Sequence, residues 1–203
     1  MTNQCLTVTA LTPTLTKAFS PTSISIGGTS TLTFTVSNPA LNPAQTVSFT
    51  DTLPAGLRVA SAPNVTNTCT GGTVTAVALS GSIAVAGTQV GAGTATPTTC
   101  TISVDITTSA TPTVGACPGT AANTNGSGQI SGLSNLTNGV TNQCLTVTAL
   151  TPTLTKAFSP TSRGQHRRHQ HTDLYSEQPS AEPSTNRQLH RHLPAGLVCG
   201  QRA

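Results

Sequence analysis

Few residues of this chain could do acid–base or nucleophilic chemistry, and they are unevenly placed. Residues 1–162 contain no histidine and no glutamate. A Ser/His/Asp or Cys/His catalytic set therefore cannot be assembled there, because each needs an imidazole base. We expect no catalytic residue, no cofactor and no enzyme activity in this part of the chain.

Asp51 and Asp105 are the only acidic side chains of residues 1–162. As a general acid and base they would have to meet in one pocket with separated pKa values. We expect instead that Asp51 caps the turn that follows it and that Asp105 faces solvent on a strand. Calcium sites normally use several carboxylates, so we also predict no metal ligands.

Lys17 raises a different kind of chemistry, the isopeptide cross-link between lysine and asparagine that some surface sandwiches carry. Such a link would need Lys17 in an apolar site, with an asparagine such as Asn142 and a carboxylate beside it. We expect instead an exposed lysine on the first strand of the domain.

Four of the six cysteines, Cys69, Cys100, Cys117 and Cys144, lie within one stretch of the chain. An even number is what two disulfides require, and disulfides imply an oxidising compartment. Of the three connectivities we favour Cys69–Cys100 and Cys117–Cys144, because each closes a loop of about 30 residues, worth on the order of 3–4 kcal/mol. Four buried free thiols are the alternative. No cysteine here has the spacing of a zinc ligand.

The segment TNQCLTVTALTPTLTKAFSPTS occurs twice, at residues 2–23 and 141–162. The two copies are offset by 139 residues (141 − 2). A repeating unit of this length is a whole domain rather than a short solenoid unit. We interpret the chain as a fragment of a longer protein, whose neighbouring repeats are its partners. The predicted parts are the last strand of a truncated repeat (1–12), a complete repeat (13–151), the start of the next repeat (152–162) and a tail (163–203).

The tail differs sharply from the rest in its charge. It holds all five histidines and six of the nine basic residues, whereas residues 1–162 carry three basic and two acidic side chains. His166, His169 and His171 are spaced like a metal cluster, and the run of Arg and His is similar to a nucleic-acid-binding arm.

A shifted reading frame accounts for this tail better than a function does. Codons for Ser25–Gly28, read one base early, give Gln165–Arg168, and one consistent codon choice extends the agreement to Leu53. We interpret residues 163–203 as the repeat read out of frame. We therefore expect a disordered segment with no role in binding metal or nucleic acid.

Charge and hydropathy exclude two further classes of partner. The near-neutral residues 1–162 give no electrostatic reason to bind nucleic acid or an acidic membrane. No stretch is apolar enough to span a bilayer. Nothing resembles a signal peptide, but the absence of one is uninformative if the chain is a fragment. We expect no nucleic-acid partner and no membrane insertion within this chain.

Several short segments of the chain alternate between apolar and polar residues with the period of a β-strand. Gly, Pro and Asn turn signals separate these segments, and none combines helical spacing with good helix formers. The pattern predicts an all-β protein, an antiparallel β-sandwich with aliphatic side chains inside and threonine outside. The predicted strands are 29–37, 46–50, 73–79, 82–86, 101–107 and 145–149.

Several motifs resemble a known group of bacterial surface repeats. They are LTFTVSN at Leu32–Asn38, LTKAFSPTSI at Leu15–Ile24, CTISVDIT at Cys100–Thr107, and DTLPAGL, formed by Asp51, Thr52, Leu53, Pro54, Ala55, Gly56 and Leu57. The group is a conserved repeat of unknown function, related to the domain of unknown function numbered eleven. The resemblance implies an immunoglobulin-like sandwich arrayed in tandem on secreted or cell-surface proteins, and it supplies no catalytic residues.

Three interpretations of function follow. The first is a non-enzymatic structural or adhesive repeat, a spacer or stalk that is extracellular or on the bacterial cell surface. The second is a module that binds glycan or protein, with host or cell-surface molecules as ligands. Glycan sites usually use aromatic platforms, and residues 13–151 have neither Trp nor Tyr, which favours the spacer. The third is a decayed, frame-shifted fragment without function.

Overall fold

The computed structural model describes residues 9–118, 123–159 and 171–177. The chain divides into two compact units, residues 1–149 and 150–203. Helical conformation among the described residues is limited to 3-10 turns, at Asn123 and at Ser127–Gln129. No helix in these ranges is long and apolar enough to cross a membrane.

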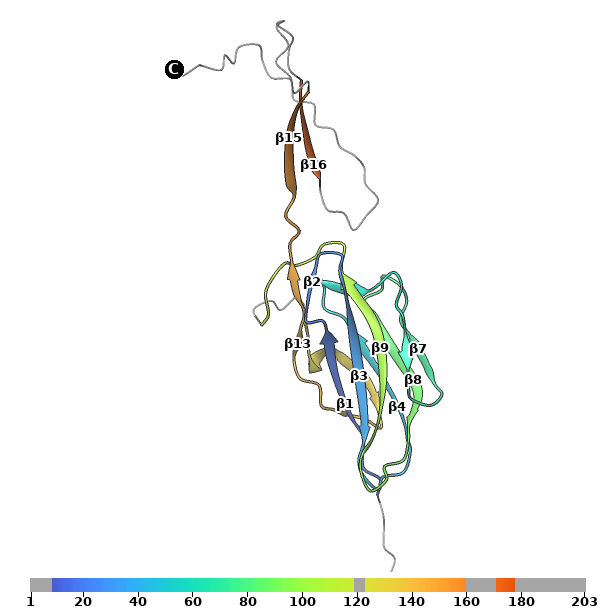
Figure 1. Ribbon diagram of the computed structural model, residues 1–203. Coiled ribbons are helices and arrows are strands. Elements are labelled where there is room, and N and C mark those ends of the chain that lie inside the picture. The colour runs from blue at the N-terminus through green and yellow to red at the C-terminus, as the bar shows by residue number, and fades with distance from the viewer. Residues whose placement is uncertain (1–8, 119–122, 160–170, 178–203) are drawn as a thin grey trace, which may run out of the picture. The chain divides into compact units, whose positions relative to one another are not determined.

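The first unit is the all-β sandwich that the sequence predicts, built from two main sheets (Figure 1). One sheet has the order β12-β1-β3-β9-β5, with β6 also paired to β9. Its strands are β1 (Thr14–Ser20), β3 (Thr29–Asn38), β5 (Leu57–Val59), β6 (Thr66–Asn67), β9 (Thr98–Thr108) and β12 (Thr137–Asn138). The other has the order β11-β4-β8-β7, with β4 (Gln45–Thr52), β7 (Thr73–Thr75), β8 (Ser82–Val90) and β11 (Ile130–Ser134).

The predicted strand at 73–79 is shorter in the structure. It ends with β7 at Thr75, and the chain then turns through Ser80, whose N–H donates to the Val77 carbonyl oxygen at 3.0 Å. Val77 and Leu79 are more than half exposed. The alternation of apolar residues beyond Thr75 therefore marks a turn rather than a paired strand.

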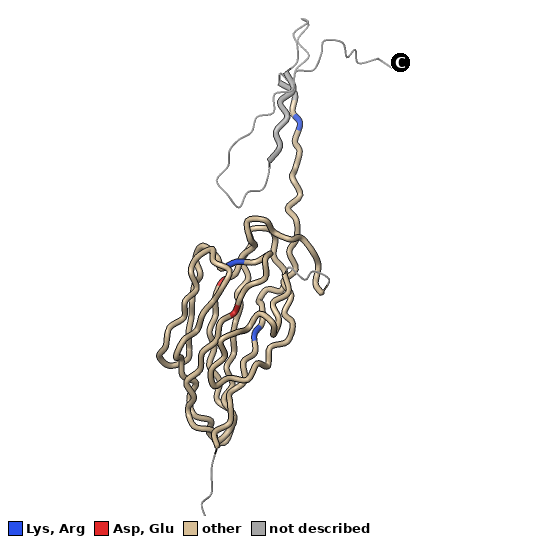
Figure 2. Tube along the Cα trace, turned by 180° about the vertical axis from the view of Figure 1, so that it is seen from behind, with Lys and Arg blue, Asp and Glu red and all other residues tan. Residues whose placement is uncertain are grey.

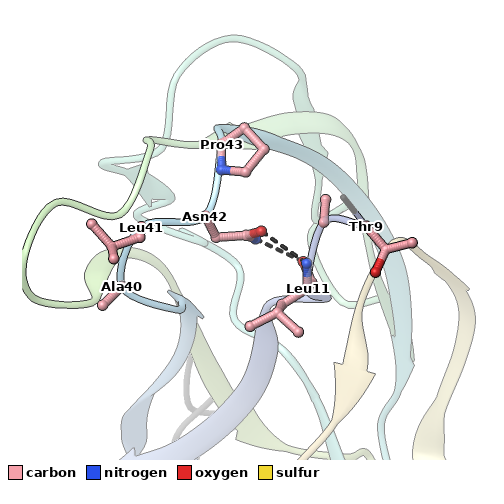
Figure 3. A pocket seen from close by; sticks show the side chains of 7 residues that line it. Thr9, Leu11, Ala40, Leu41, Asn42 and Pro43 are labelled. Atoms are coloured by element: carbon pink, nitrogen blue, oxygen red, sulfur yellow. Dashed lines mark hydrogen bonds between the residues drawn. The ribbon is translucent and has the colours of Figure 1, made fainter. Parts of the chain in front are cut away.

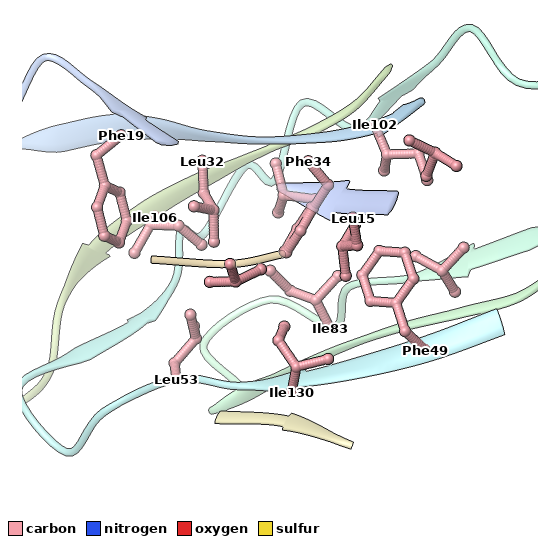
Figure 4. Packing of buried hydrophobic residues seen from close by; sticks show 14 of the residues in the cluster. Leu15, Phe19, Leu32, Phe34, Phe49, Leu53, Ile83, Ile102, Ile106 and Ile130 are labelled. Atoms are coloured by element: carbon pink, nitrogen blue, oxygen red, sulfur yellow. The ribbon is translucent and has the colours of Figure 1, made fainter. Parts of the chain in front are cut away.

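Alternating side chains of the two sheets meet in one aliphatic core. Figure 4 shows Leu32, Phe34 and Ile106 pointing from one layer toward Phe49 and Ile83 of the other, and all five side chains are buried. Phe34 and Phe49 form a tilted aromatic pair across the sheets, with ring centroids 5.1 Å apart. This packing supplies the main hydrophobic stabilisation of the fold.

Threonine and serine cover the outer face of the β3–β9 pair. Thr33 and Ser103 lie opposite each other in the register, and their hydroxyl oxygens are 3.2 Å apart. The Thr31 hydroxyl donates to the Asp105 carboxylate at 2.8 Å. Asp105 is thus half-buried and hydrogen-bonded on the strand surface, rather than simply facing solvent as expected.

Two short parallel pairings close one edge of this otherwise antiparallel fold. β12 pairs with β1, and β14 (Thr146–Thr148) pairs with β2 (Ser23–Ser25). Because β1 and β2 follow each other along the edge, the chain enters the domain near Thr14 and leaves it beside Ser25. We call these ends the N-terminal and C-terminal poles of the domain; they lie on the order of 30 Å apart, at opposite ends of the sandwich in Figure 1.

Both predicted disulfides are present. Cys69–Cys100 fastens the segment after β6 to β9, with a Cα–Cα distance of 5.0 Å and a sequence separation of 31. Cys117–Cys144 fastens the segment after β9 to β13 (Gln143–Cys144), with a Cα–Cα distance of 5.7 Å and a separation of 27. β13 in turn pairs with β10 (Thr124–Asn125). The second disulfide therefore supports a small sheet beside the main core.

The second unit contains an antiparallel pair, β15 (Thr153–Ser159) and β16 (His171–Glu177). β15 has the sequence TLTKAFS, identical to β1. Of the tail predicted to be disordered, residues 163–170 and 178–203 lie outside the described residues, and His171–Glu177 forms β16. His166 and His169 also lie outside them. The truncated repeat expected at 1–12 is described only from residue 9, where the chain has no strand.

Truncating a core aromatic tests the assignment of faces. We expect Phe34→Ala to lower the free energy of unfolding by about 3–5 kcal/mol, because it removes the inter-sheet aromatic contact and leaves a cavity. Chemical denaturation followed by circular dichroism measures this loss. Thr35→Val, the next residue on the outer face, should change stability by less than about 0.5 kcal/mol. Equal losses for the two variants would contradict this assignment of inner and outer faces.

Removing a disulfide tests its contribution to stability. We expect the double variant Cys117→Ser/Cys144→Ser to lose about 3–4 kcal/mol of unfolding free energy, because the unfolded chain regains the freedom of the loop. Cys199→Ser, outside both loops, is the control and should leave stability unchanged. Thiol titration of the native oxidised protein provides the second readout. Four reactive thiols at these positions would overturn the assignment.

Candidate functional site

Three polar side chains meet inside the sandwich, away from solvent. Lys17 comes from β1, Asp51 from β4 and Asn125 from β10. The Lys17 Nζ donates to Asp51 Oδ1 at 2.9 Å and to Asn125 Oδ1 at 2.7 Å. Asn125 Nδ2 donates to Asp51 Oδ2 at 2.7 Å, which closes the ring of contacts. The side chains of Lys17 and Asp51 are fully buried, and Asn125 has no exposed surface.

Strand periodicity places Lys17 in the core. In β1 the inward positions are Leu15, Lys17 and Phe19, because successive side chains point to opposite faces. The residue is only 4% exposed. The expectation of an exposed lysine is therefore wrong. The signal was present in the sequence, since a lysine flanked two residues away by Leu and Phe shares their face.

Asp51 follows the same rule on the opposite sheet. Val47, Phe49 and Asp51 are the buried positions of β4, and Asp51 lies opposite Ile83 in the register. The expectation that Asp51 caps the following turn is wrong. Backbone hydrogen bonds hold that turn instead: the Leu57 N–H donates to the Pro54 carbonyl oxygen at 2.9 Å.

The other residues of the DTLPAGL motif connect the two sheets. Asp51 and Thr52 end β4, and Leu57 begins β5 in the opposite sheet. Leu53 and Leu57 are 6% and 3% exposed and belong to the core. Of the remaining motif residues, Thr52 and Ala55 are exposed, Pro54 is half-buried and Gly56 is buried. The motif thus has a structural place: it carries the chain from one layer to the other.

Asn125, rather than Asn142, is the asparagine that Lys17 contacts. Asn142 is exposed, and its side chain lies against Gly126, where a Cβ would clash with it. Asn125 sits on a two-residue strand held by pairing with Gln143. So short a strand has no alternation to detect, and the surrounding sequence AANTNGSG is typical of an exposed loop. Sequence reasoning had no signal that would have selected Asn125.

Burial dominates the electrostatics of the pair. Desolvation lowers the pKa of Lys17, and attraction and hydrogen bonding to Asp51 oppose this change. Desolvation likewise raises the pKa of Asp51, opposed by Lys17 and by the hydrogen bond from Asn125. Moving one proton from Lys17 to Asp51 would remove both charges from a low-dielectric site. Burial thus favours the neutral amine and the neutral acid, whereas the mutual attraction and the hydrogen bonds favour the charged pair.

The two carboxylates of the sandwich do not form an acid–base pair. Asp105 belongs to β9, in the sheet opposite Asp51, and its partners are Thr31 and Asn64. The Asn64 amide donates to Asp105 Oδ2 at 2.8 Å. Within the ranges that the structure describes, no three His, Cys, Asp or Glu side chains gather into a metal-binding group.

A pocket lies at the N-terminal pole, where the chain approaches β1 (Figure 3). Its central polar side chain, Asn42, is already occupied. The Asn42 amide accepts from the Leu11 N–H at 2.8 Å and donates to the Leu11 carbonyl oxygen at 2.7 Å. The pocket therefore offers a ligand mainly apolar surface. It is lined by Thr9, Ala10, Leu11, Ala40, Leu41, Asn42 and Pro43.

Comparison with known families gives one match. A family model described as a domain of unknown function, DUF7933, matches residues 13–147. This match covers the sandwich, including all three residues of the buried ring and both disulfides. Comparison with curated proteins gives no significant match.

Charge at the buried ring can be tested in variants that lack Lys17. In Lys17→Met the attraction that lowers the pKa of Asp51 is lost, so this pKa stands further above its ordinary value of 3.8. The isosteric double variant Lys17→Met/Asp51→Asn is the matched control, because it carries no ionisable group there. At neutral pH we expect the single variant to be less stable than the double by about 3 kcal/mol.

The stability difference between these variants should depend on pH. Between 3.8 and the raised pKa the folded single variant holds more protons than its unfolded chain, so its stability rises as the pH falls through that interval. The double variant should lack this term. Urea denaturation of both variants across the acid range measures the difference. A difference that stays constant with pH would contradict a buried carboxyl at position 51.

Proposed function

Since the chain belongs to the DUF7933 family of domains of unknown function, we propose its role from its architecture: the domain is a non-enzymatic spacer module of a secreted or cell-surface bacterial protein. In this role it adds length and transmits tension between its neighbours. The observation that carries the proposal is the arrangement of the two poles and of the parallel strand pairs that join them.

The parallel pairs resist extension in a favourable geometry. If the two poles are pulled apart, β1 and β2 move one way while β12 and β14 move the other, along the strand axes. The hydrogen bonds between these strands then share the load in shear, instead of opening one after another. These bonds run from the Thr137 N–H to the Pro13 oxygen at 2.8 Å, from Gly139 to Leu15 at 3.0 Å, from Thr146 to Thr22 at 2.9 Å and from Ile26 to Thr148 at 3.0 Å.

The disulfides support both the compartment and the mechanical role. Two disulfides fit a secreted or extracellular protein, where thiols are not kept reduced. Each also prevents the loop that it closes from extending under tension. The core of this domain is mostly aliphatic, with Phe19, Phe34 and Phe49 as its aromatic side chains, and it benefits from such covalent support.

The surface supports a spacer better than a glycan-binding site. Figure 2 shows how sparse charged residues are along the described part of the chain. Residues 13–151 contain no Trp or Tyr to stack on a sugar ring. At the N-terminal pole Leu11 and Leu41 are 59% and 83% exposed beside the pocket. Apolar side chains at that pole suit a contact with a preceding repeat, the partner implied by the repeated segment.

Force spectroscopy on the full chain tests the spacer role. With handles at the two termini, we expect the domain to hold to a rupture force several-fold higher than in a second attachment geometry. The second geometry places one handle at the N-terminus and the other in the Ala40–Leu41 loop. Because β1 and β3 are antiparallel, with Thr14 opposite Ser37, pulling there opens the pair one bond at a time.

Two results would count against the proposal. Equal rupture forces in the two geometries would show that the edge pairing does not protect the domain. Saturable binding to a glycan array or to cells would favour the ligand-binding module instead, and Leu41→Ser would then locate the contribution of the pocket.

A further inference from the structure

The buried ring places an ion pair inside the hydrophobic core of the sandwich. A buried ion pair is often no more stable than apolar residues of similar volume. Here the pair is also joined to an amide, and each of the three side chains contacts the other two. The three groups are a nucleophile, an electrophile and a carboxyl that can move a proton between them.

Lys17 is positioned to attack Asn125. Its Nζ lies 2.7 Å from Asn125 Oδ1, the oxygen bonded to the carbonyl carbon Cγ. Because a C=O bond is about 1.23 Å long, Nζ lies within about 4 Å of Cγ. Holding the two groups together in a rigid core replaces a bimolecular encounter with a unimolecular step.

Asp51 is positioned to carry the proton. Its Oδ1 is 2.9 Å from the Lys17 Nζ, and its Oδ2 is 2.7 Å from Asn125 Nδ2, the nitrogen that would leave. One carboxyl therefore reaches both the attacking and the departing nitrogen. This is the arrangement that general acid–base catalysis requires, with heavy atoms within hydrogen-bond distance.

Burial favours the reactive forms and excludes the competing reaction. A neutral amine is the nucleophile, and desolvation lowers the pKa of Lys17 while it raises that of Asp51. Both side chains are fully buried, so water does not compete for the amide carbon.

From this geometry we propose that the folded chain joins Lys17 to Asn125 through an intramolecular isopeptide bond, with Asp51 as the proton carrier. A proton first passes from the Lys17 ammonium to Asp51. Nζ then forms a bond to Cγ of Asn125, and Asp51 returns a proton to the oxygen of the tetrahedral intermediate and accepts one from Nζ. Finally Asp51 protonates Nδ2, the Cγ–Nδ2 bond breaks, ammonia leaves, and the carbonyl reforms as its proton passes back to Asp51.

The bond would join segments at the two ends of the domain sequence. Lys17 and Asn125 are 108 residues apart, and β1 belongs to the edge that bears the parallel pairs. Asn125 is also close in sequence to Cys117, which is linked to Cys144 near the C-terminal pole. This inference goes beyond the proposed spacer role and does not depend on it, because it concerns a covalent change within the domain.

Mass spectrometry of the reduced, denatured full chain tests the proposal. We expect a mass about 17 Da below that of the sequence, the mass of one ammonia. Trypsin should then release residues 1–58 joined to residues 59–156, because the linked Lys17 no longer permits cleavage. Without the bond, the same digest gives residues 1–17, 18–58 and 59–156 as separate peptides.

The linked peptides matter because mass alone is ambiguous. Asn125 precedes Gly126, and an Asn–Gly pair can lose the same ammonia by closing on its own backbone to a succinimide. In Lys17→Ala the isopeptide bond cannot form, whereas a succinimide still can. A wild-type digest with no linked peptide, or a linked peptide that persists in Lys17→Ala, would overturn the proposal.

Matched variants separate the roles of the three residues. Asp51→Asn keeps the size of the side chain and should lower the yield of linked peptide at least tenfold, since no proton carrier remains. Lys156→Ala removes the identical lysine of the second copy and should leave the link intact. A full yield of linked peptide from Asp51→Asn would contradict the assigned role of Asp51.

The link should also require the fold. Chain recovered in denaturant without ever folding should have the full sequence mass, and the linked peptide should appear only after refolding. This test uses only wild-type protein, so the test remains valid if a variant fails to fold. A link that forms equally in denaturant, or that never forms after refolding to the native circular dichroism spectrum, would exclude a reaction promoted by the buried ring.

Discussion

Lys17 and Asp51 can share the core only because aliphatic faces of two sheets close around them. Leu15 and Phe19 flank the lysine on one sheet, and Val47 and Phe49 precede the carboxylate on the other. These side chains exclude water and so set the low dielectric that lowers the pKa of Lys17 and raises the pKa of Asp51. The hydrophobic packing that stabilises the sandwich therefore also determines the chemistry inside it.

Much of the sandwich could be predicted from local pattern. β3, β8 and β9 alternate clearly, and the structure places each of them within a few residues of the predicted bounds. The disulfides could be predicted because the four cysteines divide into two pairs with similar, moderate spacing. These features are local in sequence or depend on loop length, so they can be predicted without knowledge of the tertiary fold.

The buried ring was harder to predict, for two physical reasons. Lys17 and Asp51 occupy inward positions by strict alternation, but a charged residue at such a position is normally assumed to face solvent, because burial of a lone charge is costly. The cost is met by a partner on the other sheet, which no local pattern reveals. Asn125 lies in a strand too short to have a period, so only the folded chain brings it to the other two.

The parallel edge pairs are likewise a property of the whole fold. They join β1 and β2 to segments more than a hundred residues later, and no turn sequence encodes such a pairing. Contacts between residues so far apart in sequence form late in folding, because loop-closure entropy opposes them until the core is assembled.

The buried ring stabilises the same long-range closure of the domain, because it joins β1 to β10. Its ionic and hydrogen-bonded contacts tie the first strand to the last third of the domain, and they lie on the inner face of β1, while the parallel hydrogen bonds run along its edge. A sliding motion that breaks the edge bonds must also draw Lys17 away from two buried partners, so the polar ring and the edge pairing resist the same displacement. The energetic cost of burying charge is thus incurred at β1, a strand that also takes part in the parallel edge pairing.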